Sequence, residues 1–130
     1  MTTDAAVWMI AGLEVATAIG IAAFWLTWPK QAHEEPWLPP GYVEHEAPFM
    51  WSDAVLALVL LAAAATQVFE EPVGDSLGLI AAGMLAFLGI LDLAYFARTG
   101  LFKREHDGLM NGAVVTGVLL MSVILTVRFI

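Results

Sequence analysis

The chain has 130 residues, of which 60% are hydrophobic and 14% charged, and its mean hydropathy is +0.79. These values exclude an ordinary soluble globule and indicate an integral membrane protein. The net charge of −8, with only five Lys and Arg residues, argues against a nucleic-acid partner, because such binding needs cations that neutralise phosphates. No cysteine is present, so disulfides, thiolate metal ligands and c-type haem attachment are excluded.

Four segments are apolar enough to cross a membrane as helices, which takes about 20 residues each. The expected spans are residues 5–28, 50–69, 76–97 and 108–128. The first span lacks a basic amino-terminal region and ends in WLTWPK, so we interpret it as a retained helix and not as a signal peptide. The sequence therefore predicts an all-α integral membrane protein, with a single transmembrane domain over residues 1–130.

Two short connections predict how the spans are arranged. In EEPVGDS, Pro72 and Gly74 break the helix and Asp75 or Ser76 is the expected N-cap, which makes the second and third spans antiparallel neighbours. RTGLFKREHDG in turn brings the fourth span back beside the third. We therefore expect an up-and-down four-helix bundle.

The positive charges are distributed unevenly between the two sides of this bundle. The first and third connections hold Lys30, Arg98, Lys103 and Arg104, whereas the other side holds Arg128 and the amino terminus. The positive-inside rule counts Lys and Arg near the span ends, and it places both connections in the cytoplasm. We expect a multi-pass protein of the cytoplasmic (inner) membrane, surrounded by lipid bilayer, with both termini outside.

Two ionisable residues fall deep within the expected spans, where a charge costs at least about 2.5–3.5 kcal/mol and normally faces a partner or a wet cavity. Glu14 is the deepest, on a face of the first span shared with Trp25. Asp92 lies about two turns from the inner end of the third span, followed on its face by Tyr95. A local ion pair with Arg98 is the structural alternative to a functional carboxylate at Asp92.

The expected topology brings polar and aromatic residues from all four spans to the inner end of the bundle. We predict a polar, acidic vestibule there, with Glu14 as its floor. Asp53 has a structural alternative, since a carboxylate near the start of a helix stabilises the helix dipole. The candidate ligand- or proton-binding residues are Glu14, Trp25, Asp53, Asp92, Tyr95 and Asn111.

The first connection, residues 29–49, contains the stretch HEEPWLPPGYVEHE. Its three prolines exclude a regular helix, and Trp37, Leu38 and Tyr42 make it too apolar for a solvated tether. We expect an interfacial lid across the vestibule. A metal site is a weaker alternative, because its candidate ligands lack the helical spacing of a strong motif. Those candidates are His33, His45 and His106.

Small residues recur at four-residue spacing on the first span, at Gly12, Ala16 and Gly20. Such a stripe lets another helix approach closely. That helix belongs either to the same chain or to a second one, so a homo-oligomer and a larger membrane complex are candidate assemblies.

The segments PFMWSDAVLALVLLAAA, AAGMLAFLGILDLAYFARTGLF and EHDGLMNG resemble an uncharacterised group of small four-span bacterial membrane proteins, over about the last two thirds of the chain. That resemblance implies the four-helix architecture and no activity. A looser likeness to small multidrug resistance transporters rests on the length, the four spans and a glutamate midway along the first span, here Glu14. The long acidic first connection and Asp92 depart from that family's pattern.

Three hypotheses of function follow. The first is a membrane protein whose vestibule binds a small or amphipathic ligand, with proton-coupled transport as its extension. The second is an accessory subunit that docks into a larger membrane complex through the small-residue stripe. The third is a membrane enzyme acting on a lipid-soluble substrate, although no nucleophile elbow and no phosphate-binding glycine motif is present. The sequence assigns no cofactor.

Overall fold

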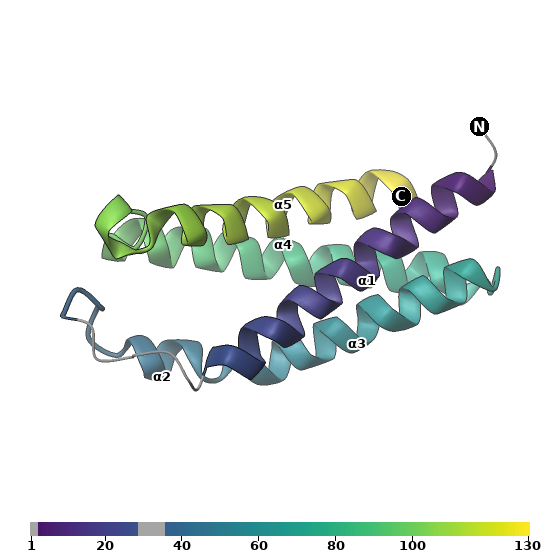
Figure 1. The fold of residues 1–130 in the computed structure, drawn as a ribbon. Coiled ribbons are helices and arrows are strands. Elements are labelled where there is room, and N and C mark those ends of the chain that lie inside the picture. Colours follow the sequence, from purple (N-terminus) through teal and green to yellow (C-terminus); the bar gives the residue numbers. More distant parts are fainter. Residues whose placement is uncertain (1–2, 29–35) are drawn as a thin grey trace.

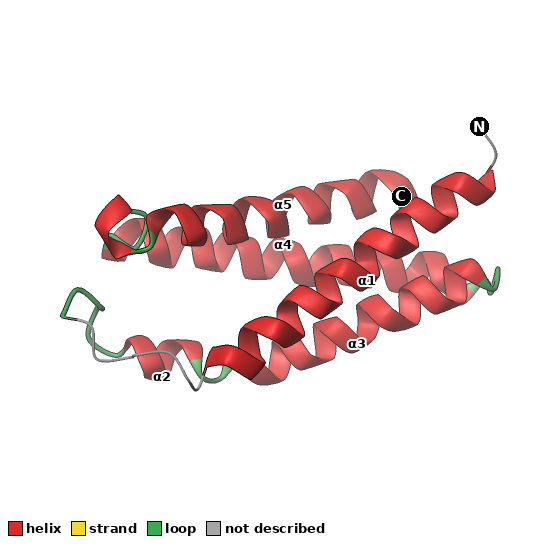
Figure 2. Cartoon of the chain, in the orientation of Figure 1, coloured by secondary structure: helices red, strands yellow, loops and turns green. Residues whose placement is uncertain are grey.

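The computed structural model describes residues 3–28 and 36–130, and within them the chain is helical, without β-strands. Two short helices lie at the same end of the molecule, named here the α2 end: α2 (Tyr42–Glu46) and the 3-10 helix η2 (Arg104–His106) (Figure 1, Figure 2). The start of α1 and the end of α5 lie at the opposite end, named the terminal end. The four long helices are α1 (Thr3–Thr27), α3 (Phe49–Val68), α4 (Val73–Thr99) and α5 (Gly108–Phe129).

Each long helix packs against the next one along the chain, α1 on α3, α3 on α4 and α4 on α5. The predicted all-α architecture is confirmed, because four helices are long and apolar enough to cross a membrane. The predicted contact of the third and fourth spans is made by α4 and α5, where Gly89 packs directly against Leu119. A Cβ atom at position 89 would overlap the Leu119 side chain, which would have to shift.

The start of α4 differs from the prediction. The helix begins at Val73, with Pro72 at the N-cap position (φ −59°) and no side chain capping it, so neither Asp75 nor Ser76 is the N-cap. The fixed φ of proline already matches a first helical turn. Gly74 then packs closely on Gln67 of α3, where a Cβ atom at position 74 would lie 3.0 Å from the glutamine side chain. The tight turn between α3 and α4 depends on this approach.

The core consists of one stripe of buried residues on each long helix, and their spacings of three, four, six and seven residues keep them near one face. The stripes are Ala11, Glu14 and Ala18 on α1; Asp53, Leu56, Leu60 and Gln67 on α3; Leu85, Asp92 and Phe96 on α4; and Val115, Met121 and Leu125 on α5. Carboxyl and amide groups thus occupy positions where the apolar pattern alone would place hydrophobic side chains. Each of these polar groups needs a partner or a role.

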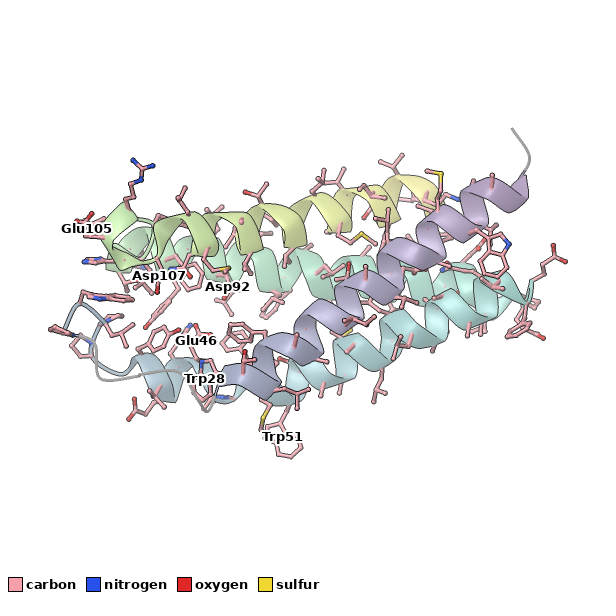
Figure 3. The ribbon with its side chains drawn as sticks, in the orientation of Figure 1. Trp28, Glu46, Trp51, Asp92, Glu105 and Asp107 are labelled. Atoms are coloured by element: carbon pink, nitrogen blue, oxygen red, sulfur yellow. The ribbon has the colours of Figure 1, made fainter. Side chains whose placement is uncertain are left out.

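The outer surface of the helices is strongly apolar. Trp51 projects away from the other helices and is 74% exposed (Figure 3). Soluble monomers rarely expose apolar patches this extensive. Large apolar side chains with at least 70% of their surface exposed include Leu26, Trp51, Phe69, Phe87, Leu109 and Val127.

The small-residue stripe of α1 belongs to this outer surface. Gly12, Ala16 and Gly20 are all exposed, and nothing lies within 4 Å of the place a Cβ atom would take at either glycine. The opposite face of α1 carries the buried residues that pack on α3. The stripe is therefore not the face by which α1 joins the other described helices.

Part of the first connection is held against the α2 end. Its prolines were expected to exclude a regular helix, yet α2 forms directly after Pro40, where Gly41 adopts a left-handed conformation (φ 79°). The Trp37 ring stacks on His106, with 5.1 Å between ring centroids. Residues 29–35, which include His33, lie outside the described residues. The residues of this connection that pack on Phe96, Leu101 and Val115 are Trp37, Leu38 and Tyr42.

Candidate functional site

Three buried carboxyl groups meet at the α2 end of the bundle. Asp53 on α3 and Asp92 on α4 are each 9% exposed, and Glu46, the last residue of α2, is 7% exposed. Glu46 lies within electrostatic range of both aspartates, and the two aspartates are within range of each other. Figure 3 shows Glu46 and Asp92 on facing elements at this end.

Asp53 has a hydrogen-bond partner on a neighbouring helix. The Trp25 Nε1–H group donates to Asp53 Oδ2 at 2.8 Å, which ties α1 to the first turns of α3. The indole of Trp25 also packs on Trp28, with 5.3 Å between ring centroids. The carboxylate of Asp53 is thus bonded across a helix interface and not to the amides at the start of its own helix.

Asp92 and Glu46 have no comparable partner among the described residues. Asp92 accepts no hydrogen bond from them, and Arg98, its candidate partner, is exposed and forms no ion pair. Glu46 Oε1 has no hydrogen-bond partner, and the one basic atom within 4.0 Å of it is His45 Nε2, at 4.0 Å. That distance is beyond a hydrogen bond. Within residues 3–28 and 36–130, no Lys or Arg therefore pairs with these three acids.

The three carboxyl groups line one groove, of about 390 Å³, that lies between α1 and α5. This volume is in the range of small-molecule sites, about 300–1,000 Å³. Away from the acids its walls are mostly apolar, with Thr17 and Asn111 as polar exceptions. They include Gly20 on the α1 side and Gly117 on the α5 side. Its aromatic lining consists of Phe24, Trp25, Tyr42, Phe49 and Phe96.

Glu14 lies outside this groove, in a second buried site. Its side chain is fully buried, and Gln67 Nε2 donates to Glu14 Oε2 at 3.2 Å and to the Gly74 carbonyl oxygen at 3.1 Å. The pairing with Gln67, near the last turn of α3, places Glu14 toward the terminal end. Glu14 is therefore not the floor of the acidic site that the sequence led us to expect.

Tyr95 and Asn111 differ in their relation to the groove. The Tyr95 ring stacks on His45, with 3.8 Å between centroids, and does not line the groove. Asn111 does line it, and its Nδ2 donates to the Leu101 carbonyl oxygen at 2.7 Å. That bond fixes the connection between α4 and α5. The predicted site residues that the groove brings together are Trp25, Asp53, Asp92 and Asn111.

Glu46 is the groove residue that sequence reasoning missed, because it lies in the first connection, which we expected to cover the vestibule as a lid and not to supply one of its carboxyl groups. Its spacing from Asp53 could have indicated that Glu46 belongs to the site. Glu46 and Asp53 are seven residues apart, which places two side chains on the same face of a nearly continuous helical segment. The short break between α2 and α3 preserves that relation.

The candidate metal ligands His45 and His106 contact different residues. His45 stacks on Tyr95, and His106 stacks on Trp37 with its Nδ1 3.0 Å from the Gly100 carbonyl oxygen. Across the part of the chain that the structure describes, no group of three or more His, Asp or Glu side chains is arranged to hold a metal ion. His33, the remaining candidate, falls outside that part.

No family model, curated protein or solved structure matches this chain. The functional argument therefore depends on the fold and on the groove. They define an all-helical protein with an apolar exterior and an acidic end to an otherwise mostly apolar groove.

Proposed function

We propose that this is an integral protein of the cytoplasmic membrane, with four spans, both termini outside and the α2 end on the cytoplasmic side. Its insertion is supported by the four long apolar helices and by the large hydrophobic side chains on their outer surface. The orientation is supported by Lys103 and Arg104, which lie at the α2 end in a short connection, where the positive-inside rule applies.

The groove of this protein binds a small amphipathic ligand. The observation that carries this proposal is a set of three buried carboxyl groups, without a Lys or Arg partner among the described residues, at one end of an otherwise mostly apolar groove. Burying an unpaired carboxylate is costly, so such a set is expected where a ligand supplies the missing partner. The polar end of the ligand lies at Asp53, Asp92 and Glu46, and its apolar part lies between α1 and α5.

The groove is suited to a ligand that arrives from the bilayer. Gly20 and Gly117 line it from α1 and α5, both are exposed, and nothing lies within 4 Å of a Cβ atom built on either one. The gap between these two helices therefore opens sideways. In a membrane that opening faces hydrocarbon, from which an amphipathic molecule can enter with its apolar part first.

Native mass spectrometry of the gently solubilised protein tests this function. We expect a small molecule to co-purify with the wild type and with Glu14→Gln, since Glu14 does not line the groove, and to be lost from Asp92→Asn. Protein that carries no small molecule in all three preparations contradicts the proposal. Loss from Glu14→Gln alone moves the binding site to Glu14.

A second candidate function, membership of a larger membrane complex, has one observation in its favour. The small residues of α1 face outward with open space around Gly12 and Gly20. Faces of this kind allow close helix approach in membranes. Under this alternative the buried acids are structural and the protein remains attached to larger partners in every variant.

A further inference from the structure

We infer that the ligand of the groove is a lipophilic ammonium ion, an amphipathic amine whose protonated nitrogen carries N–H donors. This inference depends on the proposed function and names the chemical class of its ligand. It follows from the charge, the hydrogen-bond inventory and the walls of the groove, taken in turn.

The acidic end of the groove carries three carboxyl groups and no basic side chain among its described lining residues. Asp53, Asp92 and Glu46 are all more than nine-tenths buried and within electrostatic range of one another. No Lys or Arg side chain of the described residues lies within 4.0 Å of them. A positively charged ligand reduces the mutual repulsion of these groups, whereas an anion increases it.

The hydrogen-bond inventory calls for donors. Asp92 accepts no hydrogen bond within the described chain, and Glu46 Oε1 is buried without a partner. Most donors of the groove lining are already used, because the indole N–H of Trp25 donates to Asp53, and the Asn111 amide and the Thr17 hydroxyl donate to backbone carbonyl oxygens. The Tyr42 hydroxyl adds one more donor, which can satisfy only one of the two acids. A ligand that brings N–H groups satisfies Asp92 and Glu46 through charge-assisted bonds. A quaternary ammonium ion has no N–H group and cannot.

The walls next to the carboxyl groups are aromatic. Rings of Phe24, Trp25, Tyr42, Phe49 and Phe96 line the same groove. Aromatic rings attract organic cations through the negative potential of their faces. They also accommodate the carbon atoms attached to the nitrogen, which a bare metal ion does not have. The lining thus fits an alkylammonium group better than an inorganic cation.

The remainder of the groove fits an apolar chain or ring. About 390 Å³ is far more space than one ammonium group needs, and beyond the acids the α5 side is lined by Met110, Ala113, Val114 and Gly117. The ligand therefore carries a hydrophobic body, which lies between α1 and α5.

An ammonium ion with a hydrophobic body has two sources in a membrane, a free amphipathic amine or the amine headgroup of a lipid. A lipid of that kind carries a phosphate next to its amine. The groove offers no cation to pair with that phosphate among its lining residues. We therefore assign the free amine as the ligand and let the experiment distinguish the two sources.

The test measures binding to the full chain in phosphatidylcholine nanodiscs by calorimetry, with empty nanodiscs subtracted. The probes are octylammonium, octyltrimethylammonium, 1-octanol and octanoate, which share one chain and differ in the head. We expect octylammonium to bind about ten-fold more tightly than 1-octanol, since a hydrogen bond to a charged group contributes about 1.5–3 kcal/mol. Octyltrimethylammonium should bind between the two, and octanoate most weakly.

Variants locate the site that gives this ranking. Asp92→Asn and Glu46→Gln should each weaken octylammonium binding about ten-fold and leave 1-octanol binding unchanged. Glu105→Gln is the matched control, because it removes the same charge from an exposed side chain at the same end of the molecule and should change neither affinity (Figure 3). The probe ranking on the wild type remains decisive if a variant fails to fold.

The outcomes separate the inference from the function beneath it. Equal affinities of octylammonium and 1-octanol overturn the ammonium assignment while the amphipathic ligand stands. Equal affinities of octylammonium and octyltrimethylammonium overturn the need for N–H donors. Binding of none of the probes counts against both the inference and the proposed function. Competition by phosphatidylethanolamine, added to the nanodiscs, supports the ammonium group and identifies a lipid as its source.

Discussion

The two buried acidic sites of this molecule both contain carboxyl groups, but they differ in hydrogen-bond partners and in access to the groove. Glu14 is fully buried, faces Gln67 and adjoins the start of α4 through the Gln67 bond to Gly74. Asp92 and Glu46 are almost as deeply buried, yet both line an open groove and neither accepts a hydrogen bond within the described chain. Glu14 thus has a partner on α3 and does not line the groove, whereas Asp92 and Glu46 line the groove without such a partner.

This difference shows that burial of a carboxyl group does not by itself indicate a binding site. Glu14 is the more buried acid and the deepest ionisable residue of the expected spans. Its partner Gln67, however, belongs to the chain. Among the described residues, neither Glu14 Oε1 nor Gln67 Oε1 has a hydrogen-bond donor, and a protonated Glu14 supplies the O–H group that the pair otherwise lacks. Access to a cavity is what distinguishes the Asp92 site.

The largest effect is expected from Asp92→Leu. Ligand binding should fall about ten- to a hundred-fold, because a charged hydrogen-bond partner is lost, while stability should stay constant or rise by about 1–3 kcal/mol, because an unpaired buried acid is removed. Octylammonium affinity and unfolding in mixed micelles measure the two effects. Lower stability with unchanged binding would make Asp92 a structural residue and reduce the contrast between the two sites.

The fold was largely predictable from the sequence because its determinants are local. Twenty-residue apolar segments separated by Pro, Gly and charges fix four helices, and the short connections fix which helices are neighbours. The face of α1 that carries Glu14 and Trp25 could also be predicted from the helical period. The depth at which each residue meets the next helix could not be predicted. We therefore expected Glu14 as the floor of the vestibule, whereas the structure pairs it with Gln67 near the last turn of α3.

The next effect is on stability and concerns the Glu14 site. Gln67→Leu should destabilise the protein by about 1–3 kcal/mol, because it leaves the Glu14 carboxyl group buried without its hydrogen-bond donor. The double substitution Glu14→Leu with Gln67→Leu should recover most of this loss, since both polar partners are then replaced by apolar groups. Denaturant titration of the wild type, Glu14→Leu, Gln67→Leu and the double variant gives the coupling energy between the two residues. An additive result would show that the two residues do not act as a pair.

The candidate site was only partly predictable, for a reason that Glu46 illustrates. A helix pattern identifies the face of a residue within one element, but a groove is formed by elements distant in the chain. Asp53 and Asp92 were identified because polar residues stand out in apolar helices. Glu46 stands among other acids in the first connection, where composition favours a solvated role, and only its packed position distinguishes it from Glu44, which is exposed.

A smaller effect is expected at the wall of the groove formed by α5. Gly117→Leu should weaken octylammonium and 1-octanol alike, by a few-fold, because the new side chain occupies space along the ligand's apolar body. Gly112→Leu is its control on the same helix, since both glycines have open space around them and only Gly117 lines the groove. Equal effects of the two substitutions would indicate a general change in α5 and argue against this wall.

The smallest effects are expected on α1, where one substitution pair distinguishes ligand binding from docking. Gly20 belongs to both the outward stripe and the groove, whereas Gly12 belongs to the stripe alone. If the groove is the functional site, Gly20→Leu weakens octylammonium binding slightly and Gly12→Leu changes nothing. If the stripe docks onto another helix, both substitutions reduce the mass of the complex isolated in mild detergent, because each places a large side chain in a close helix contact. Octylammonium affinity and native mass, measured on the same preparations, therefore distinguish the two roles of α1. An unchanged Gly12→Leu variant indicates ligand binding, and a lower mass of its complex indicates docking.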